Sequence, residues 1–126
     1  MADPSTADLW RWRAGRQGTG YERLLLAATP WPLPCDAWLL RFRPGTGVPA
    51  HVDPARPGTL HYRLNIYLRK ARKGGEFEVS ECIARGPRFA LFRPDVATHA
   101  VHRVEEGTRL VLSIGWLRRA PRRHPE

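Results

Sequence analysis

The hydrophobic and polar positions of this chain follow two different patterns, and the change comes near residue 35. Ahead of it, the run YERLLLAAT at residues 21–29 contains helix-forming residues and is followed directly by Pro30. Proline cannot continue a helix, so the run predicts one short helix that ends there. The residues before the run are polar and dotted with glycine, which predicts a partly ordered lead-in.

From residue 35 onward, short apolar or alternating runs are separated by glycine and proline. Six runs have this form: DAWLLRFR, LHYRLNIYL, EFEV, RFALF, HAVHRV and TRLVLSIGWL. Turn-forming residues stand between them, for example Pro44-Gly45 and Gly74-Gly75. About six to eight short strands without intervening helices indicate an all-β barrel or a two-sheet sandwich such as a jelly roll.

The chain of 126 residues fits one compact domain and leaves no room for a second functional domain. We divide it into an N-terminal segment at 1–34 with the short helix, a β-barrel at 35–117, and a basic, proline-broken tail at 118–126. No run approaches the roughly 18 apolar residues of a membrane span, and the N-terminus lacks the apolar stretch of a signal peptide. We therefore expect a soluble protein of the cytoplasm.

Charge and cysteine content narrow the function classes only slightly. The formal net charge is +9, which favours anionic partners such as acidic metabolites, nucleic acid or an acidic protein, without choosing among them. Only two of the 21 basic residues are lysine. This bias follows from codon composition as readily as from selection for phosphate binding, so we discount it as a nucleic-acid signal. Cys35 and Cys82 are far apart, which indicates neither a disulfide scaffold nor a thiolate zinc site.

The candidate chemistry begins at His51-Val52-Asp53. On an extended segment the side chains alternate, so His51 and Asp53 point the same way and can converge on one ion. An HxD triplet alone is a weak motif, and a catalytic metal ion needs a third ligand from another strand. Four histidines are candidates for that ligand: His61, His99, His102 and His124.

Of these, His99 is favoured because it is the first residue of a predicted strand, directly after a turn. Binding sites in β-barrels commonly lie at the open end of the barrel, where strands begin or end. His102 lies three residues later, and on a strand it points to the opposite side, so we expect it at the surface or behind the ligands. His124 lies in the tail. Two histidines and one carboxylate on one face of an ion form the facial triad of non-haem Fe(II) oxygenases, which leaves the opposite face open.

Further matching residues extend from about residue 36 to residue 117. They are Tyr67-Leu68, Gly74-Gly75, Phe92, His99, Val104, Gly107, Arg109 and Trp116. With the HxD triplet, they make the chain resemble the 2-oxoglutarate/Fe(II)-dependent oxygenases, above all the prolyl 4-hydroxylase-like branch. The resemblance implies a double-stranded β-helix, an Fe(II) ion held by His51, Asp53 and His99, 2-oxoglutarate as cosubstrate and ascorbate as reductant.

The resemblance also implies that Arg109, ten residues after His99, clamps the remote carboxylate of 2-oxoglutarate. Physical reasoning agrees, because the planar and always charged fork of arginine matches a buried carboxylate. Without that spacing, Arg109 is equally well one more surface arginine. One departure is Phe42, which stands where many such enzymes carry a tyrosine that bonds the cosubstrate. Tyr62 or Tyr67 is an alternative source of that hydroxyl, and a rearranged pocket is another explanation.

The run HYRLNIYL at residues 61–68 has one mostly apolar face and one polar face. Similarity to the aspartyl/asparaginyl β-hydroxylase-like oxygenases implies that Asn65 and Tyr67 contact 2-oxoglutarate, and that Arg63 contacts either the cosubstrate or the substrate. The polar face then lines a wet cavity. The alternative is that this face is simply exposed to solvent.

The reaction implied is hydroxylation of a C–H bond in a small molecule, an amino acid or a peptide, with decarboxylation of 2-oxoglutarate to succinate. The basic charge suits an anionic substrate. Two alternatives stay open. One is an oxygenase of the same class that acts on nucleic acid, although no aromatic-rich basic stretch is evident. The other is a non-catalytic cupin-like metal-binding module, for which Glu76 and Glu78 are out of place as ligands. We expect a monomer or a homodimer.

Overall fold

A computed structural model describes residues 9–15, 20–29 and 34–121 of the chain, and every regular element within these ranges is a β-strand. The strands are β1 (Trp12–Ala14), β2 (Glu22–Thr29), β3 (Cys35–Phe42), β4 (Val48–His51), β5 (Thr59–Arg69), β6 (Lys73–Gly74), β7 (Phe77–Val79), β8 (Ala84–Gly86), β9 (Phe89–Phe92), β10 (His99–Val101), β11 (Val104–Glu106) and β12 (Arg109–Arg119). The all-β prediction is confirmed. His124 and most of the predicted tail lie outside the described residues. Over the described ranges, no helix is long and apolar enough to span a membrane.

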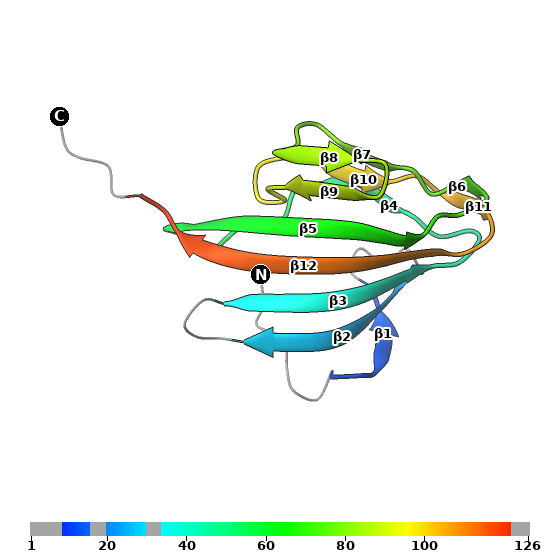
Figure 1. Ribbon diagram of the computed structural model, residues 1–126, viewed down its shortest axis with the longest axis horizontal. Coiled ribbons are helices and arrows are strands. Elements are labelled where there is room, and N and C mark those ends of the chain that lie inside the picture. The colour runs from blue at the N-terminus through cyan, green and yellow to red at the C-terminus, as the bar shows by residue number, and fades with distance from the viewer. Residues whose placement is uncertain (1–8, 16–19, 30–33, 122–126) are drawn as a thin grey trace.

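The strands form one large sheet, one small sheet and a two-stranded ribbon. The large sheet has the order β1-β2-β3-β12-β5-β9-β8, the small sheet has the order β4-β10-β7, and β11 pairs with β6. Along the chain the main strands alternate between the two sheets, because β3, β5, β9 and β12 lie in the large one and β4, β7 and β10 in the small one. This alternation is typical of a double-stranded β-helix. Figure 1 shows the long strands β5 and β12 side by side at the centre of the large sheet.

The predicted short helix over residues 21–29 is wrong, because this run forms β2. Its backbone hydrogen bonds lie in the sheet, where β2 pairs antiparallel with both β1 and β3. Adjacent side chains on a strand point to opposite faces, and Leu24 and Leu25 are nevertheless both buried. Leucine and alanine favour a helix in isolation, but pairing with β3 and burial of the two leucines outweigh that preference.

The hydrophobic core lies between the two sheets. Its buried members are Tyr21, Phe42, Tyr67, Ala90, Phe92, Val104 and Val111. The rings of Tyr21 and Phe42 stack with their centroids 4.9 Å apart. Partly buried residues of the small sheet pack against the cluster: Val48, Phe77, Val79 and Val101. This packing holds the small sheet, which carries the candidate metal ligands, against the large one.

Phe42→Ala should lower the free energy of unfolding by about 3–5 kcal/mol, the range for truncating a buried phenylalanine. Phe42 is only 1% exposed, so its removal leaves a cavity in the core. Leu68→Ala is the control, because Leu68 is 48% exposed and surface substitutions usually change stability by less than about 0.5 kcal/mol. Denaturant unfolding measures both variants. Equal losses would contradict the assignment of Phe42 to the core.

Candidate metal centre

The small sheet brings together the three residues predicted as metal ligands. His51 is the last residue of β4 and His99 is the first residue of β10, and the two are direct partners in the antiparallel pairing of these strands. Their ring centroids lie 4.3 Å apart. Asp53 follows β4, and its backbone N–H donates to the carbonyl oxygen of Pro94, 2.7 Å away, which ties the segment after β4 to the segment before β10.

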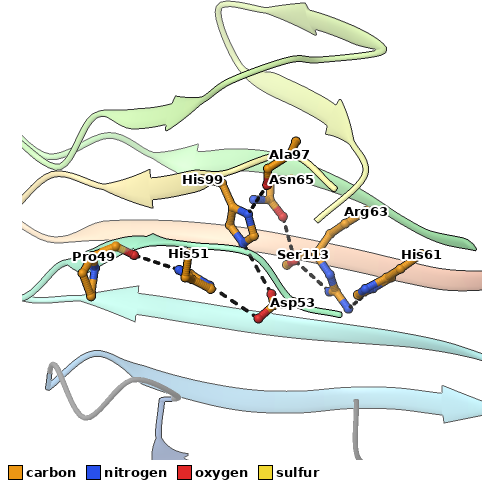
Figure 2. Close-up of polar contacts among 9 residues, drawn as sticks. All are labelled: Pro49, His51, Asp53, His61, Arg63, Asn65, Ala97, His99 and Ser113. Carbon is orange, nitrogen blue, oxygen red and sulfur yellow. Dashed lines mark hydrogen bonds and ion pairs between the residues drawn. The ribbon is translucent and has the colours of Figure 1, made fainter. Parts of the chain in front are cut away.

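The carboxylate of Asp53 lies between the two imidazoles (Figure 2). The Oδ1 of Asp53 is 3.5 Å from the Nε2 of His51, and its Oδ2 is 3.4 Å from the Nε2 of His99. Ligand atoms of all three residues lie within 4.8 Å of one another. Residues separated by 48 positions in the sequence therefore meet as one group.

Hydrogen bonds to backbone carbonyls fix the orientation of both imidazoles. The Nδ1 of His51 lies 2.8 Å from the carbonyl oxygen of Pro49, and the Nδ1 of His99 lies 2.9 Å from that of Ala97. A carbonyl oxygen only accepts, so each Nδ1 carries the proton and donates it. In a neutral imidazole, the Nε2 lone pair then faces the carboxylate of Asp53. With both imidazoles neutral, three acceptors converge, which is the arrangement that a bound cation satisfies.

A cavity of about 130 Å³ opens beside this group. Apolar side chains form much of its wall, and two aromatic rings contact the imidazole of His99, with centroid distances of 5.2 Å to Phe92 and 6.4 Å to Phe77. Drug-sized ligands occupy pockets of about 300–1,000 Å³. The cavity therefore suits a small ligand, or one side chain of a larger one.

The first half of the polar face of β5 lines the same cavity, whereas Arg69 at the end of the strand is exposed, so the cavity interpretation holds for that half. His61, Arg63 and Asn65 all contribute to the cavity wall. The Nη2 of Arg63 donates to Asp36 at 2.8 Å, and its Nη1 donates to the hydroxyl of Ser113 at 2.9 Å. That hydroxyl in turn donates to the side-chain oxygen of Asn65 at 2.6 Å (Figure 2). The guanidinium is thus held in one orientation.

Gly115 makes room for the side chain of Arg63. The two residues are partners in the pairing of β12 with β5, and a Cβ atom at position 115 would collide with the guanidinium of Arg63. Because Gly115 has no side chain, the guanidinium of Arg63 can lie against β12. There it contacts Asp36 and Ser113.

His61 is a buried neutral histidine that the sequence analysis did not select. It is 2% exposed, and its Nε2 lies 3.4 Å from the Nη2 of Arg63. Burial lowers the pKa of His61 to about 4, and the neighbouring positive charge of Arg63 adds to the effect. Its Nδ1 has no hydrogen-bond partner among the described residues. Near neutral pH, His61 is an uncharged part of the cavity wall.

Arg109 and Tyr67 are buried, but they do not line the cavity. The Cζ of Arg109 lies 4.6 Å from the ring centroid of Tyr67 and 6.0 Å from that of Phe42, and Phe42 is part of the cavity wall. Burial lowers the pKa of Arg109 and raises that of Tyr67. Arg109 thus packs near an aromatic residue of the cavity wall and is not itself part of that wall.

His102 lies at the surface, as the strand alternation predicts. Its Nε2 is 3.0 Å from the carboxylate of Glu78, and its side chain is 55% exposed. Glu78 is therefore turned away from the candidate ligands. Two further residues of the cavity wall, Arg23 and Asp36, were missed. Asp36 alternates with Trp38 and two apolar residues on one face of β3, and this pattern indicates that its side chain points inward.

Comparisons with known proteins give a fold but no family. No family model matches the chain, and no curated protein matches its sequence significantly. A Pseudomonas putida prolyl-4-hydroxylase has a similar structure, with a TM-score of 0.64 and 16% identity over 87% of this chain and 78% of that one. KdgF from Halomonas sp. has a TM-score of 0.59 and 20% identity over 86% of this chain and 87% of that one.

A third solved structure is the viral collagen prolyl hydroxylase of Paramecium Bursaria Chlorella virus-1. Its TM-score is 0.50 and its identity is 22%, over 69% of this chain and 59% of that one. At such low identities these similarities show a shared barrel fold. They agree with the predicted double-stranded β-helix and leave the chemistry to be argued from the residues.

Asp53→Asn should abolish tight binding of Fe(II) or of Zn(II) as a redox-inactive substitute. The substitution replaces the carboxylate between the two histidines by a neutral amide and leaves only two imidazole ligands. Isothermal titration calorimetry measures the loss. His102→Ala is the matched control. It also removes a histidine, but the side chain of His102 contacts Glu78 and not the three candidate ligands. Unchanged metal affinity in Asp53→Asn would contradict the assignment.

The depressed pKa of His61 predicts a pH-dependent stability. Between pH 6.5 and about 4 the unfolded chain binds a proton that the folded chain does not, so stability falls as the pH falls through this window. The loss is as much as about 3 kcal/mol by pH 4. His61→Gln, which cannot titrate, should lose less stability than the wild type over the same range. Denaturant unfolding at several pH values tests this, and parallel profiles for the two proteins would contradict it.

Proposed function

We propose that this protein is an Fe(II)/2-oxoglutarate-dependent dioxygenase that hydroxylates a C–H bond of a small molecule, an amino acid or a peptide. The observation that carries the proposal is the convergence of three acceptors, from His51, Asp53 and His99, beside a small and mostly apolar cavity. Two imidazoles and one carboxylate are the donor set of non-haem Fe(II) oxygenases. The similar fold of two prolyl hydroxylases supports the proposal but does not carry it.

Three groups of residues have different roles in this proposal: the metal ligands, the carbonyls that orient them, and the aromatic rings beside them. His51, Asp53 and His99 would hold the ion, and the carbonyl oxygens of Pro49 and Ala97 keep the two imidazoles in the ligating tautomer. A bound Fe(II) would supply the coordination of 2-oxoglutarate and O2 and the oxidation of the C–H bond. The rings of Phe77 and Phe92 beside His99 make this part of the cavity wall apolar, which would limit the access of water to a bound ion.

Arg109 takes the remote carboxylate of 2-oxoglutarate in this proposal. It is 4% exposed, its Nε has no hydrogen-bond partner, and it makes no ion pair with the described residues. Burial disfavours its charge, the hydroxyl of Tyr67 and the charge of Glu76 offset this only in part, and a ligand carboxylate would relieve the remaining cost. Arg109 packs against Phe42, which is part of the cavity wall, so in this proposal the ligand reaches Arg109 past the ring of Phe42. Tyr67, whose ring lies against Arg109, supplies the hydroxyl that Phe42 lacks.

Asn65 and Arg63 line the cavity and remain proposed contacts to bound ligand. Arg63 already pairs with Asp36, and Asn65 already accepts from Ser113, so both are fixed before any ligand arrives. Fixed polar groups orient a ligand without a further loss of side-chain entropy. We assign them to orientation of the substrate or cosubstrate rather than to its main electrostatic attraction.

Succinate should form from 2-oxoglutarate only when Fe(II) and ascorbate are present, and Asp53→Ala should abolish its formation, because the ion loses its carboxylate ligand. Metabolites and peptides are screened as substrates, with succinate measured by mass spectrometry. His102→Ala should retain the activity of the wild type, since His102 pairs with Glu78 at the surface.

Two outcomes would favour the other interpretations. Metal binding without succinate formation across the screen would favour a non-catalytic cupin-like module, and normal turnover by Asp53→Ala would end the oxygenase proposal. Succinate formation driven by single-stranded nucleic acid, with an affinity that falls steeply as salt is raised, would favour the nucleic-acid-directed enzyme.

A further inference from the structure

Arg23 projects from β2 into the wall of the cavity beside the candidate metal centre. Its Cζ lies 4.7 Å from the ring centroid of Trp38, which lines the same cavity from the neighbouring strand β3. A guanidinium over an indole is attracted to the ring face. The stacking therefore restrains Arg23 without using its N–H donors.

The charges of the cavity wall single out Arg23. The wall holds two arginines and two aspartates, and three of these four residues already have partners or roles: Arg63 pairs with Asp36 at 2.8 Å, and Asp53 belongs to the candidate metal centre. Arg23 makes no ion pair with any described residue. Its Nε is buried and has no hydrogen-bond partner there. A buried donor without an acceptor is costly, so the side chain is set up for an acceptor that the described part of the chain does not provide.

We infer that Arg23, stacked on Trp38, forms a subsite for the carboxylate of the substrate. This inference rests on the proposed function, because it assumes that the substrate enters the cavity beside the metal centre. One free guanidinium offers parallel N–H donors to one carboxylate, a bidentate pair that combines charge and geometry. One guanidinium balances the single charge of a carboxylate but only part of the charge of a phosphate dianion, and Arg63 is already neutralised by Asp36. The volume of about 130 Å³ suits a small organic acid or one acidic side chain of a peptide.

The subsite is separate from the proposed clamp for the cosubstrate. Arg109 lies near Phe42 and is not part of the cavity wall, whereas Arg23 is. Two guanidiniums that make no ion pair with the described residues, at different places, can take two different carboxylates. The cosubstrate then binds through Arg109 and the metal ion, and the substrate through Arg23.

Propionate and its neutral isostere propionamide test the subsite, with binding to the metal-free chain measured by ligand-observed NMR at low salt. Wild type should bind propionate more tightly than propionamide. Arg23→Gln should weaken propionate binding about tenfold or more, because a charge-assisted hydrogen bond is lost, and Arg23→Lys should give a smaller loss because the charge stays but the planar fork does not.

Arg41→Gln is the matched control. Arg41 also stacks on a tryptophan, with its Cζ 3.8 Å from the ring centroid of Trp12, but it pairs with Glu22 and does not line the cavity. The control removes the same charge and the same kind of stacking, so it should leave propionate binding unchanged. Equal propionate affinity in wild type and Arg23→Gln would overturn the subsite.

Binding of 2-oxoglutarate to the Zn(II)-loaded chain separates the two sources of a carboxylate. An unchanged affinity in Arg23→Gln supports the substrate subsite, whereas a tenfold loss would assign Arg23 to the cosubstrate and overturn the inference as stated. None of these measurements needs turnover. A chain that binds propionate through Arg23 but forms no succinate would keep the subsite and lose the proposed function.

Discussion

Two backbone carbonyl oxygens determine what the paired histidines can do. By accepting from the Nδ1 atoms of His51 and His99, the carbonyls of Pro49 and Ala97 turn both Nε2 lone pairs toward Asp53. Without these bonds either ring could flip and donate to the carboxylate, and the group would be an ordinary hydrogen-bonded cluster. With them, three acceptors meet and a cation is the partner that satisfies all of them. The pairing of β4 with β10 supplies this arrangement, so the site is a consequence of strand register.

The opposite side of the cavity depends on one face of β12. Because alternate residues of a strand share a face, Arg109, Ser113 and Gly115 all point inward from this strand. Each has a different consequence: a buried cation, a hydroxyl that links Arg63 to Asn65, and a position without a side chain that admits the guanidinium of Arg63. A shift of the register of β12 by one residue would turn all three outward at once. The polar network and the barrel closure therefore depend on the same pairing.

Much of this architecture could be predicted from the sequence, because alternation carries over directly into faces of strands. Alternation predicts the strands β5 and β12, and the structure brings His51, Asp53 and His99 together. The run at β2 does not predict a strand, since its leucines and alanines favour a helix locally and only the partner strands decide otherwise. Spacing along the chain singles out Arg109, which opens β12, but it carries no information on the packing of this side chain near Phe42.

Arg23 and Arg109 make no ion pair with the described residues, and the Nε of each is buried without a hydrogen-bond partner there. Arg63 and Asp36 neutralise each other, so they add shape and hydrogen bonding without attracting an anion strongly. Arg23 and Arg109 are restrained by aromatic rings instead of carboxylates, and a cation–π contact contributes only about 0.5–2 kcal/mol. That is enough to hold a guanidinium in place and too little to replace an anionic partner. The fold therefore leaves two guanidiniums without an ion pair among the described residues, and an anionic ligand would supply the carboxylate that each lacks.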